Sequence, residues 1–140
     1  MAETIHVDIV SAEGEIFSGP ARMVFAPASE GEVGIAPRHA PLLTLLKAGE
    51  VRVQTPDGEE HFFFVGGGAL EIQPRKVTVL ADTALRARDL DEAAALAAKQ
   101  RAEEALREKV SKIEQAEALA ELARAAAQLK VIERLRKLRG

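Results

Sequence analysis

The sequence predicts an α+β fold in which an antiparallel β-sandwich or barrel, residues 1–86, precedes a helical region, residues 87–140. In the first region apolar and polar residues alternate over short segments that Gly, Pro and Asp separate, which is typical of strands. From residue 89 the chain is rich in Ala, Leu, Glu, Lys and Arg and has no Gly or Pro before Gly140, which is typical of helices. A length of 140 residues suits one core with one appendage.

Four segments carry the strand prediction. Residues 5–9 alternate apolar and polar side chains, so one face of this strand should be buried. Residues 51–54 repeat the pattern, and the turn sequence Pro56-Asp57-Gly58 separates them from the apolar run 62–65, which predicts a hairpin. Residues 77–81 continue the alternation after a break at Pro74.

Three consecutive glycines, Gly66 to Gly68, could suggest a phosphate-binding loop. The residues that follow are strand-like and no helix begins there, so the geometry of such a loop is missing. The glycines instead predict a β-bulge or a close approach of two backbones within a sheet.

The C-terminal region contains two sequence patterns that are typical of a helix start. Asp89 can cap a helix while Glu92 reaches back to it, and Ser111 and Glu114 repeat this spacing. The region is therefore either an antiparallel hairpin bent at residues 108–111 or one rod of about 49 residues and about 75 Å.

The expected apolar stripes of these helices consist of alanine and do not decide between the two forms. The stripe residues are Ala93, Ala97 and Ala105 on the first helix and Ala116, Ala120, Ala123 and Ala127 on the second. Alanine buries little area, so each closed pair contributes at most about 1 kcal/mol. A hairpin held this loosely could open and act as a switch, while a static hairpin on the sandwich remains the equal alternative.

Charge separates the two regions. Residues 1–86 carry seven basic and twelve acidic side chains, whereas residues 87–140 carry twelve basic and ten acidic ones. Five cations lie within the ten residues 130–139: Lys130, Arg134, Arg136, Lys137 and Arg139. The helix dipole favours some of them, but their number favours docking on an acidic protein surface. No aromatic residue lies among them to stack on a nucleic-acid base.

Enzymatic chemistry finds little support in the sequence. There is no cysteine, and the histidines His6, His39 and His61 lack the spacing of a metal site, so we expect no metal and no cofactor. Glu30, Glu32 and His39 lie in the stretch SEGEVGIAPRHAPLL, residues 29–43. Its prolines and glycines favour a loop shaped for a partner over a purely structural loop, and both over an acid/base site.

The start of the chain lacks the features of a signal peptide, and no apolar run approaches the roughly 20 residues that cross a bilayer. Together with the absence of cysteine, these features lead us to expect a cytoplasmic protein that could dock on a membrane assembly.

Four segments, in this order, resemble the epsilon subunit of the bacterial rotary F-type ATP synthase: MAETIHVDIVSAEGEIFSG, SEGEVGIAPRHAPLL, VGGGALEIQPRKVTVLADTA and DLDEAAALAAKQRAEEAL. The resemblance implies a sandwich of about ten strands, residues 1–86, followed by an antiparallel two-helix hairpin, residues 87–140. It also implies a non-catalytic rotor subunit of the central stalk that joins the gamma subunit to the ring of c subunits. Glu32 and His39 would contact the c ring, and the location would be peripheral, on the cytoplasmic face of the bacterial inner membrane.

For the helical region the resemblance implies regulation of ATP hydrolysis. When the helices extend along gamma, basic residues of the second helix would contact the acidic catalytic beta subunits of the alpha/beta ring and inhibit hydrolysis. The residues in question are Arg124, Lys130, Arg134, Arg136 and Lys137. The alternative is a purely structural stalk subunit that does not switch.

Some members of this family bind ATP between the folded helices. Here Asp91, Arg101 and Arg124 are the candidate nucleotide contacts, but Ala94 and Gln128 stand where the family pattern has arginines. A triphosphate would lose charge-assisted hydrogen bonds without those two cations. We therefore expect weak or absent ATP binding.

Overall fold

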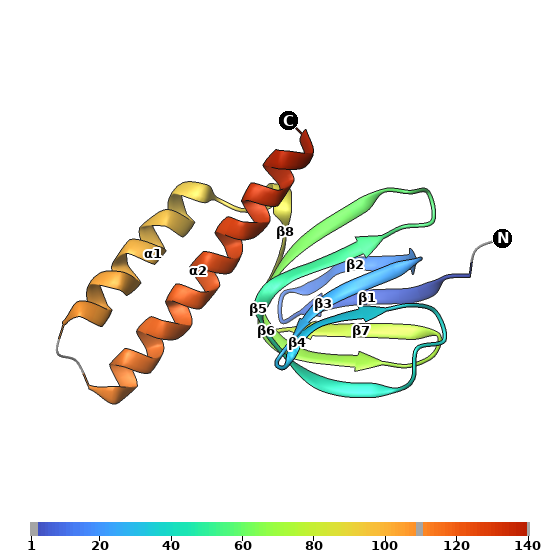
Figure 1. The fold of residues 1–140 in the computed structure, drawn as a ribbon, viewed down its shortest axis with the longest axis horizontal. Helices are drawn as coiled ribbons and strands as arrows, with labels where there is room; N and C mark the ends of the chain where they lie inside the picture. Colours follow the sequence, from blue (N-terminus) through green and yellow to red (C-terminus); the bar gives the residue numbers. More distant parts are fainter. Residues whose placement is uncertain (1–2, 109–110, 140) are drawn as a thin grey trace.

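The computed structural model describes residues 3–108 and 111–139. Eight strands precede two helices, and Figure 1 shows the helices lying beside the strands as a separate layer. The elements are β1 (Ile5–Ser11), β2 (Gly14–Ala21), β3 (Met23–Ala28), β4 (Gly31–Ile35), β5 (Leu42–Gln54), β6 (Glu60–Ile72), β7 (Lys76–Ala81), β8 (Ala84–Arg86), a 3-10 turn (Ala87–Asp89), α1 (Glu92–Arg107) and α2 (Lys112–Arg139).

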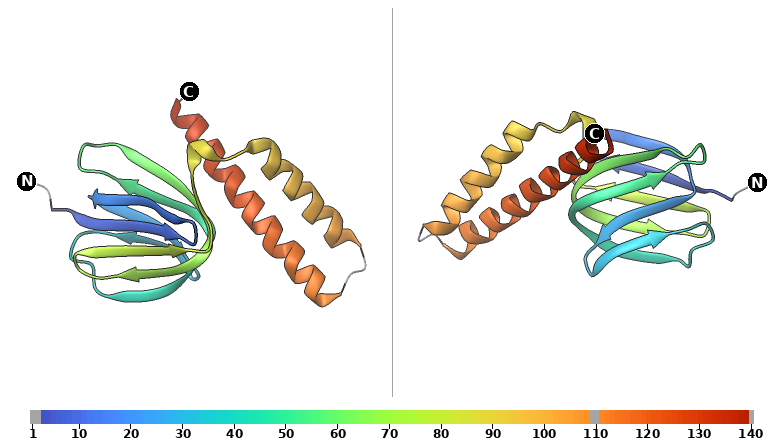
Figure 2. Two further views of the ribbon diagram at one scale, coloured as in Figure 1. Left: turned by 180° about the vertical axis from the view of Figure 1, so that it is seen from behind. Right: turned by 45° about the horizontal axis from the view of Figure 1, so that its top comes forward.

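The predicted β-sandwich is confirmed. The strand order is β2-β1-β7-β6-β5-β3-β4, with β8 paired to β6, and the sheet curves into two layers (Figures 1 and 2). All pairs are antiparallel except β1 with β7, which run parallel, so the expectation of a wholly antiparallel sandwich is wrong at this pair. The strands number eight rather than about ten because β5 and β6 each continue for 13 residues. One end of β6 pairs with β7 and the other with β8.

The sandwich encloses its own core. Ile5, Val7 and Ile9 are fully buried and contribute one alternating face of β1, as the period of two predicts. The same cluster takes in buried residues from seven further strands, Phe63 and Leu70 among them. Each such side chain contributes about 1.5–3 kcal/mol on burial. This core contains no residue of α1 or α2.

Gly66 to Gly68 mark the point where β6 changes partner from β8 to β7. A Cβ on Gly68 would lie 2.1 Å from the carbonyl oxygen of Leu80, and Gly68 has φ +130°. The predicted close approach of backbones is thus confirmed. The alternative, a bulge, is wrong, because the β5–β6 register runs without a shift along both strands.

The C-terminal region is a hairpin rather than a single rod. Both views in Figure 2 show α1 and α2 side by side, and α1 makes most of its tertiary contacts with α2. The predicted bend includes residues 109 and 110, which lie outside the described residues.

The helix starts agree with the sequence at one of two positions. In α2 the Ser111 hydroxyl accepts a hydrogen bond from the Glu114 backbone N–H at 3.2 Å, as predicted. In α1 the cap is Asp91, whose carboxylate accepts from the Ala94 N–H at 3.1 Å, so the assignment to Asp89 is wrong. The reason is that Asp89 belongs to the 3-10 turn and extended Leu90 packs on the sandwich before α1 begins.

The predicted alanine stripes are misplaced. The buried alanines are Ala95 and Ala102 on α1 and Ala118 and Ala125 on α2, each pair seven residues apart, whereas only Ala127 of the predicted set is buried. The error arises because α2 contacts two surfaces, α1 and the sandwich, and its composition does not show which alanines face which surface.

A second apolar cluster attaches α2 to the sandwich. Val131 is fully buried and Ala127 nearly so, against Phe62 and Phe64 of β6 and Ala87 of the 3-10 turn. Leu135 packs on the same cluster. Two phenylalanines bury several times the area of an alanine, so opening the hairpin costs more than alanine pairs alone would.

Candidate functional site

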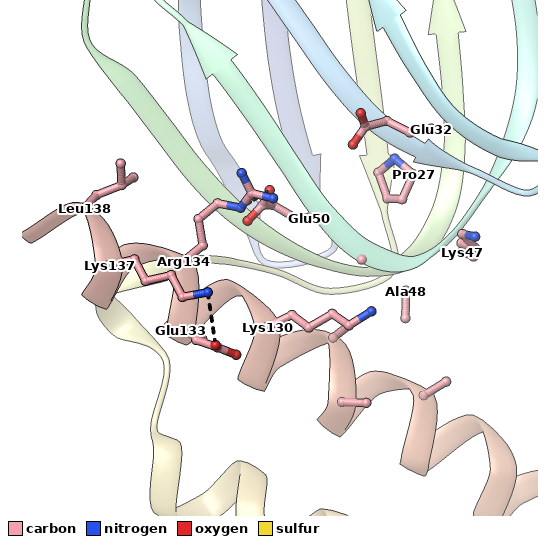
Figure 3. Close-up of a pocket in the computed structure, with 14 residues that line it drawn as sticks. Pro27, Glu32, Lys47, Ala48, Glu50, Lys130, Glu133, Arg134, Lys137 and Leu138 are labelled. Carbon is pink, nitrogen blue, oxygen red and sulfur yellow. Dashed lines mark ion pairs between the residues drawn. The ribbon is translucent and has the colours of Figure 1, made fainter.

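The main cavity lies between α2 and the sandwich and has a volume of about 790 Å³. Figure 3 shows Arg134 reaching from α2 toward Glu50 of the strands, while Lys137 pairs with Glu133 of its own helix. Its walls include cations of α2, carboxylates of the sandwich and a floor of small residues; these are Pro27, Glu32, Lys47, Ala48, Gly49, Glu50, Ala123, Ala126, Ala127, Lys130, Glu133, Arg134, Lys137 and Leu138. We call this cavity the α2 groove.

Glu50 on β5 is the central acidic residue of the α2 groove. Its side chain is 16% exposed and pairs with Arg134 of α2, Nε to Oε1, at 3.1 Å. Nε of Arg52 lies 3.5 Å from the same oxygen, and the Arg52 guanidinium lies over the Phe25 ring. Burial raises the pKa of Glu50 above its ordinary value, and the charges of Arg134 and Arg52 oppose this increase. The sequence reasoning missed Glu50.

The other predicted inhibitory cations have different surroundings. Arg136 pairs with Glu92 at the start of α1, and Lys137 pairs with Glu133 one turn back at 3.3 Å. Lys130 is exposed and lines the α2 groove. Arg124 lies over β6, since a Cβ on Gly66 would be 3.7 Å from its Cδ. Lys130, Arg134 and Lys137 therefore share the α2 groove, whereas Arg124 and Arg136 are not among the residues that line it.

Of the two predicted c-ring residues, Glu32 lies within the edge strand β4 and His39 in the loop that follows it. Glu32 pairs across β3–β4 with Pro27 and its carboxylate lies 3.5 Å from Arg52, so it faces the α2 groove. His39 follows the other end of β4, in a loop where its Nδ1 lies 2.7 Å from the Ala40 carbonyl oxygen. Arg38 in this loop has φ 66° and donates its N–H to Pro74 O.

The candidate nucleotide contacts are each engaged with a different neighbour. Asp91 caps α1, Arg101 lies 3.8 Å from Glu121 of α2, and Arg124 extends over Gly66. Within residues 3–108 and 111–139, no group of three or more His, Asp or Glu side chains is placed to hold a metal ion.

A polar cluster on β1 and β2 escaped the sequence reasoning. The Ser18 hydroxyl donates to Asp8 Oδ1 at 2.7 Å, His6 Nε2 lies 2.9 Å from the same oxygen, and Lys76 Nζ lies 3.2 Å from Oδ2. Chiefly the bond from Ser18 lowers the pKa of Asp8 to about 2. Serine and aspartate both face the same nitrogen of His6, which is not the relay of a catalytic triad.

The sandwich also displays an uncovered apolar row. Leu45, Ala69 and Leu80 are register partners on β5, β6 and β7, and the two leucines are 67% and 51% exposed. Leu43, 73% exposed, lies two residues along β5 on the same face. We call these four residues the apolar row; its signal in the sequence was the leucine-rich run at residues 42–46, apolar on both faces of the strand.

Neither described helix is both long and apolar enough to cross a bilayer. The family model for the β-sandwich domain of the ATP synthase delta/epsilon chain matches residues 4–87. The model for the long α-helix domain of the same chain matches residues 88–133.

Curated relatives match the chain over nearly its whole length. The ATP synthase epsilon chain of Nitrosococcus oceani is 68% identical over 140 residues, with 100% of both chains covered. That of Alkalilimnicola ehrlichii is 64% identical over 134 residues, with 96% of each covered.

A solved mitochondrial ATP synthase from Euglena gracilis contains a chain of the same fold. The TM-score is 0.72 at 16% identity, with 98% of this chain and 82% of that chain covered. The matched fold, the two family models and the high identity to the relatives agree. The chain therefore belongs to the delta/epsilon chain family of ATP synthase, together with the epsilon chains.

Proposed function

We propose that this chain is a non-catalytic rotor subunit of the central stalk of a bacterial ATP synthase, where it links the gamma subunit to the c ring during proton-coupled ATP synthesis. It would lie peripherally on the cytoplasmic face of the inner membrane. Residues 1–86 would form the unit that assembles with gamma and the c ring, and residues 87–140 the regulatory unit. The observation that carries this division is the presence of two separate apolar clusters, one inside the sandwich and one beneath α2.

The apolar row is the surface that we assign to gamma. Monomeric proteins seldom expose several neighbouring leucines on one sheet face, and such patches commonly mark protein interfaces. The row lies on β7, on the half of β6 that pairs with it and on the adjoining part of β5, whereas α2 covers Phe62 and Phe64 on the other half of β6. A rotor partner could therefore bind the row without displacing the hairpin.

Contact with the c ring is assigned to the edge strand β4, which contains Glu32, and to the following loop, which contains His39. Exchanging both for alanine should weaken the coupling of proton flow to ATP synthesis several-fold, because two polar contacts are lost at a surface that transmits torque. The readout is ATP synthesis by membrane vesicles at a fixed proton gradient. The isolated variant should keep its circular dichroism spectrum, since both side chains lie outside the core. Full coupling in the double variant would remove these residues from the interface.

Inhibition of ATP hydrolysis is assigned to the extended hairpin, with Arg124, Lys130, Arg134, Arg136 and Lys137 against acidic catalytic beta subunits. Arg134 pairs with Glu50 of the sandwich and Arg136 with Glu92 of α1, so extension would release these two cations for another partner. The pair of Lys137 with Glu133 lies within α2 and would persist. The first two pairs also favour the second candidate function, a structural stalk subunit whose hairpin stays closed. Weak or absent ATP binding is proposed for either case.

Truncation after Arg88 in the assembled enzyme separates these two functions. We expect the sandwich to remain folded and bound to gamma, since its core contains no residue of either helix. ATP hydrolysis should rise several-fold when the inhibitory cations are gone. Hydrolysis is compared with that of the full-length complex after gel filtration confirms equal subunit content. An unchanged rate would support the structural stalk subunit.

A further inference from the structure

The sandwich carries an unbalanced charge cluster beneath α2. Three carboxylates surround one guanidinium: Glu32 and Glu50 lie 3.5 Å from Arg52, and Glu60 lies 4.0 Å from it. The side chains of Glu50 and Arg52 are only 16% and 19% exposed, so water screens them incompletely. One cation cannot balance three anions, and the sandwich by itself leaves an excess of negative charge at this place.

The hairpin supplies a further cation. Arg134 extends from α2 to Glu50, as Figure 3 shows, with Nε 3.1 Å from Oε1. Next to it, Arg136 pairs with Glu92 and ties the same end of α2 to the start of α1. Arg134 itself is 49% exposed, so the carboxylate is the more deeply buried partner of the pair.

We propose that Glu50 is an internal counter-charge that holds α2 on the sandwich through Arg134 and competes with acidic partner surfaces for this cation. When α2 moves away to contact another subunit, the guanidinium of Arg134 leaves Glu50, so it cannot bind Glu50 and a carboxylate of that subunit at the same time. Docking of the hairpin and contact with a partner are therefore mutually exclusive. The inhibitory half of this inference rests on the function proposed above, whereas the docking half concerns the isolated chain alone.

The burial of the pair predicts an asymmetry between its two partners. In Arg134→Gln the carboxylate of Glu50 stays buried under α2 with Arg52 alone, a cation that it shares with two other acids, which is costly. In Glu50→Gln the guanidinium of Arg134 remains half in water and loses little. Release of α2 lets Glu50 regain water, so Arg134→Gln should favour the released state more strongly than Glu50→Gln does.

Hydrogen exchange of the α2 amides around Val131 tests this in the full-length isolated chain, with β1 amides as an internal reference. We expect opening of α2 to increase about threefold in Glu50→Gln and about tenfold or more in Arg134→Gln, as is usual for buried charged hydrogen bonds. In the Glu50→Gln background, Arg134→Gln should add less than about twofold. The matched control is Glu60→Gln, which removes another acid of the cluster and should leave α2 exchange unchanged.

Two results would overturn the proposed role of Glu50 as a counter-charge. One is an increase in α2 exchange by Arg134→Gln that is the same with and without Glu50; the other is an increase by Glu60→Gln as large as that by Glu50→Gln. A second readout is ATP hydrolysis by the assembled enzyme, which should fall in Glu50→Gln because release becomes easier. Faster α2 exchange with unchanged hydrolysis in both Glu50→Gln and the truncated complex would refute the proposed inhibition and the competition, while the docking role of Glu50 would be confirmed.

Discussion

Gly68→Ala is expected to lower the free energy of unfolding by about 4 kcal/mol or more, a large part of the roughly 5–15 kcal/mol that is ordinary for a folded domain. Two effects add at this position. A side chain at φ +130° is strained by about 1–3 kcal/mol. The added Cβ would also lie 2.1 Å from the backbone oxygen of Leu80, and neither backbone can move away without breaking the β6–β7 pairing.

Gly14→Ala is the matched control, because Gly14 has the same φ of +130° and a Cβ there meets nothing within 4 Å. Gly14→Ala should lower the free energy of unfolding only by the backbone strain of the positive φ. Urea unfolding followed by far-ultraviolet circular dichroism measures both variants, as the chain has no Trp or Tyr for fluorescence. Equal losses in the two variants would show that the close approach to Leu80 contributes nothing.

Val131→Asp is expected to release the hairpin while the sandwich stays folded. Val131 is fully buried between α2 and the phenylalanines of β6, and an unpaired carboxylate at such a place costs about 3–5 kcal/mol. The released state leaves the aspartate in water, so the opening equilibrium should shift by more than about 100-fold. Spin labels on cysteines introduced at the exposed residues Asp57 and Leu138 report the distance between sandwich and helix, since the chain has no cysteine of its own.

The control for this prediction is Ala120→Asp, a carboxylate at an exposed position of α2. It should keep the labels at the distance of the closed chain. If Val131→Asp also keeps that distance, the cluster around Phe62 and Phe64 does not hold the hairpin. In the assembled enzyme the released hairpin of Val131→Asp should lower ATP hydrolysis, provided that the proposed inhibition operates.

Local patterns predicted the strands well because each depends on near neighbours. The alternation of Ile5, Val7 and Ile9 depends only on which side chains share a face, and the three are buried as expected. The Pro-Asp-Gly turn depends on backbone preferences of its own residues and joins β5 to β6 as predicted. The three glycines indicated that another backbone segment approaches them closely, but they did not indicate that this segment is the backbone of Leu80.

The candidate site was harder to predict, since its parts are far apart in the sequence. Glu50 and Arg134 are 84 positions apart, and neither lies in a motif that implies the other. The apolar run at residues 62–65 did contain a usable signal: a strand that is apolar on both faces must be covered on both. This signal predicts that another element of the chain covers Phe62 and Phe64, and the structure identifies that element as α2.

The sequence by itself determined the β-to-α order, the faces of the strands, the helix start at Ser111 and the concentration of cations near the C-terminus. Only the tertiary structure decided that the helices form a hairpin, which alanines are buried and which acids face the cations. The physical reason is that alternation and capping act over a few residues. Alanine-rich helices, by contrast, can pack on several of their faces, and the surfaces they meet select one.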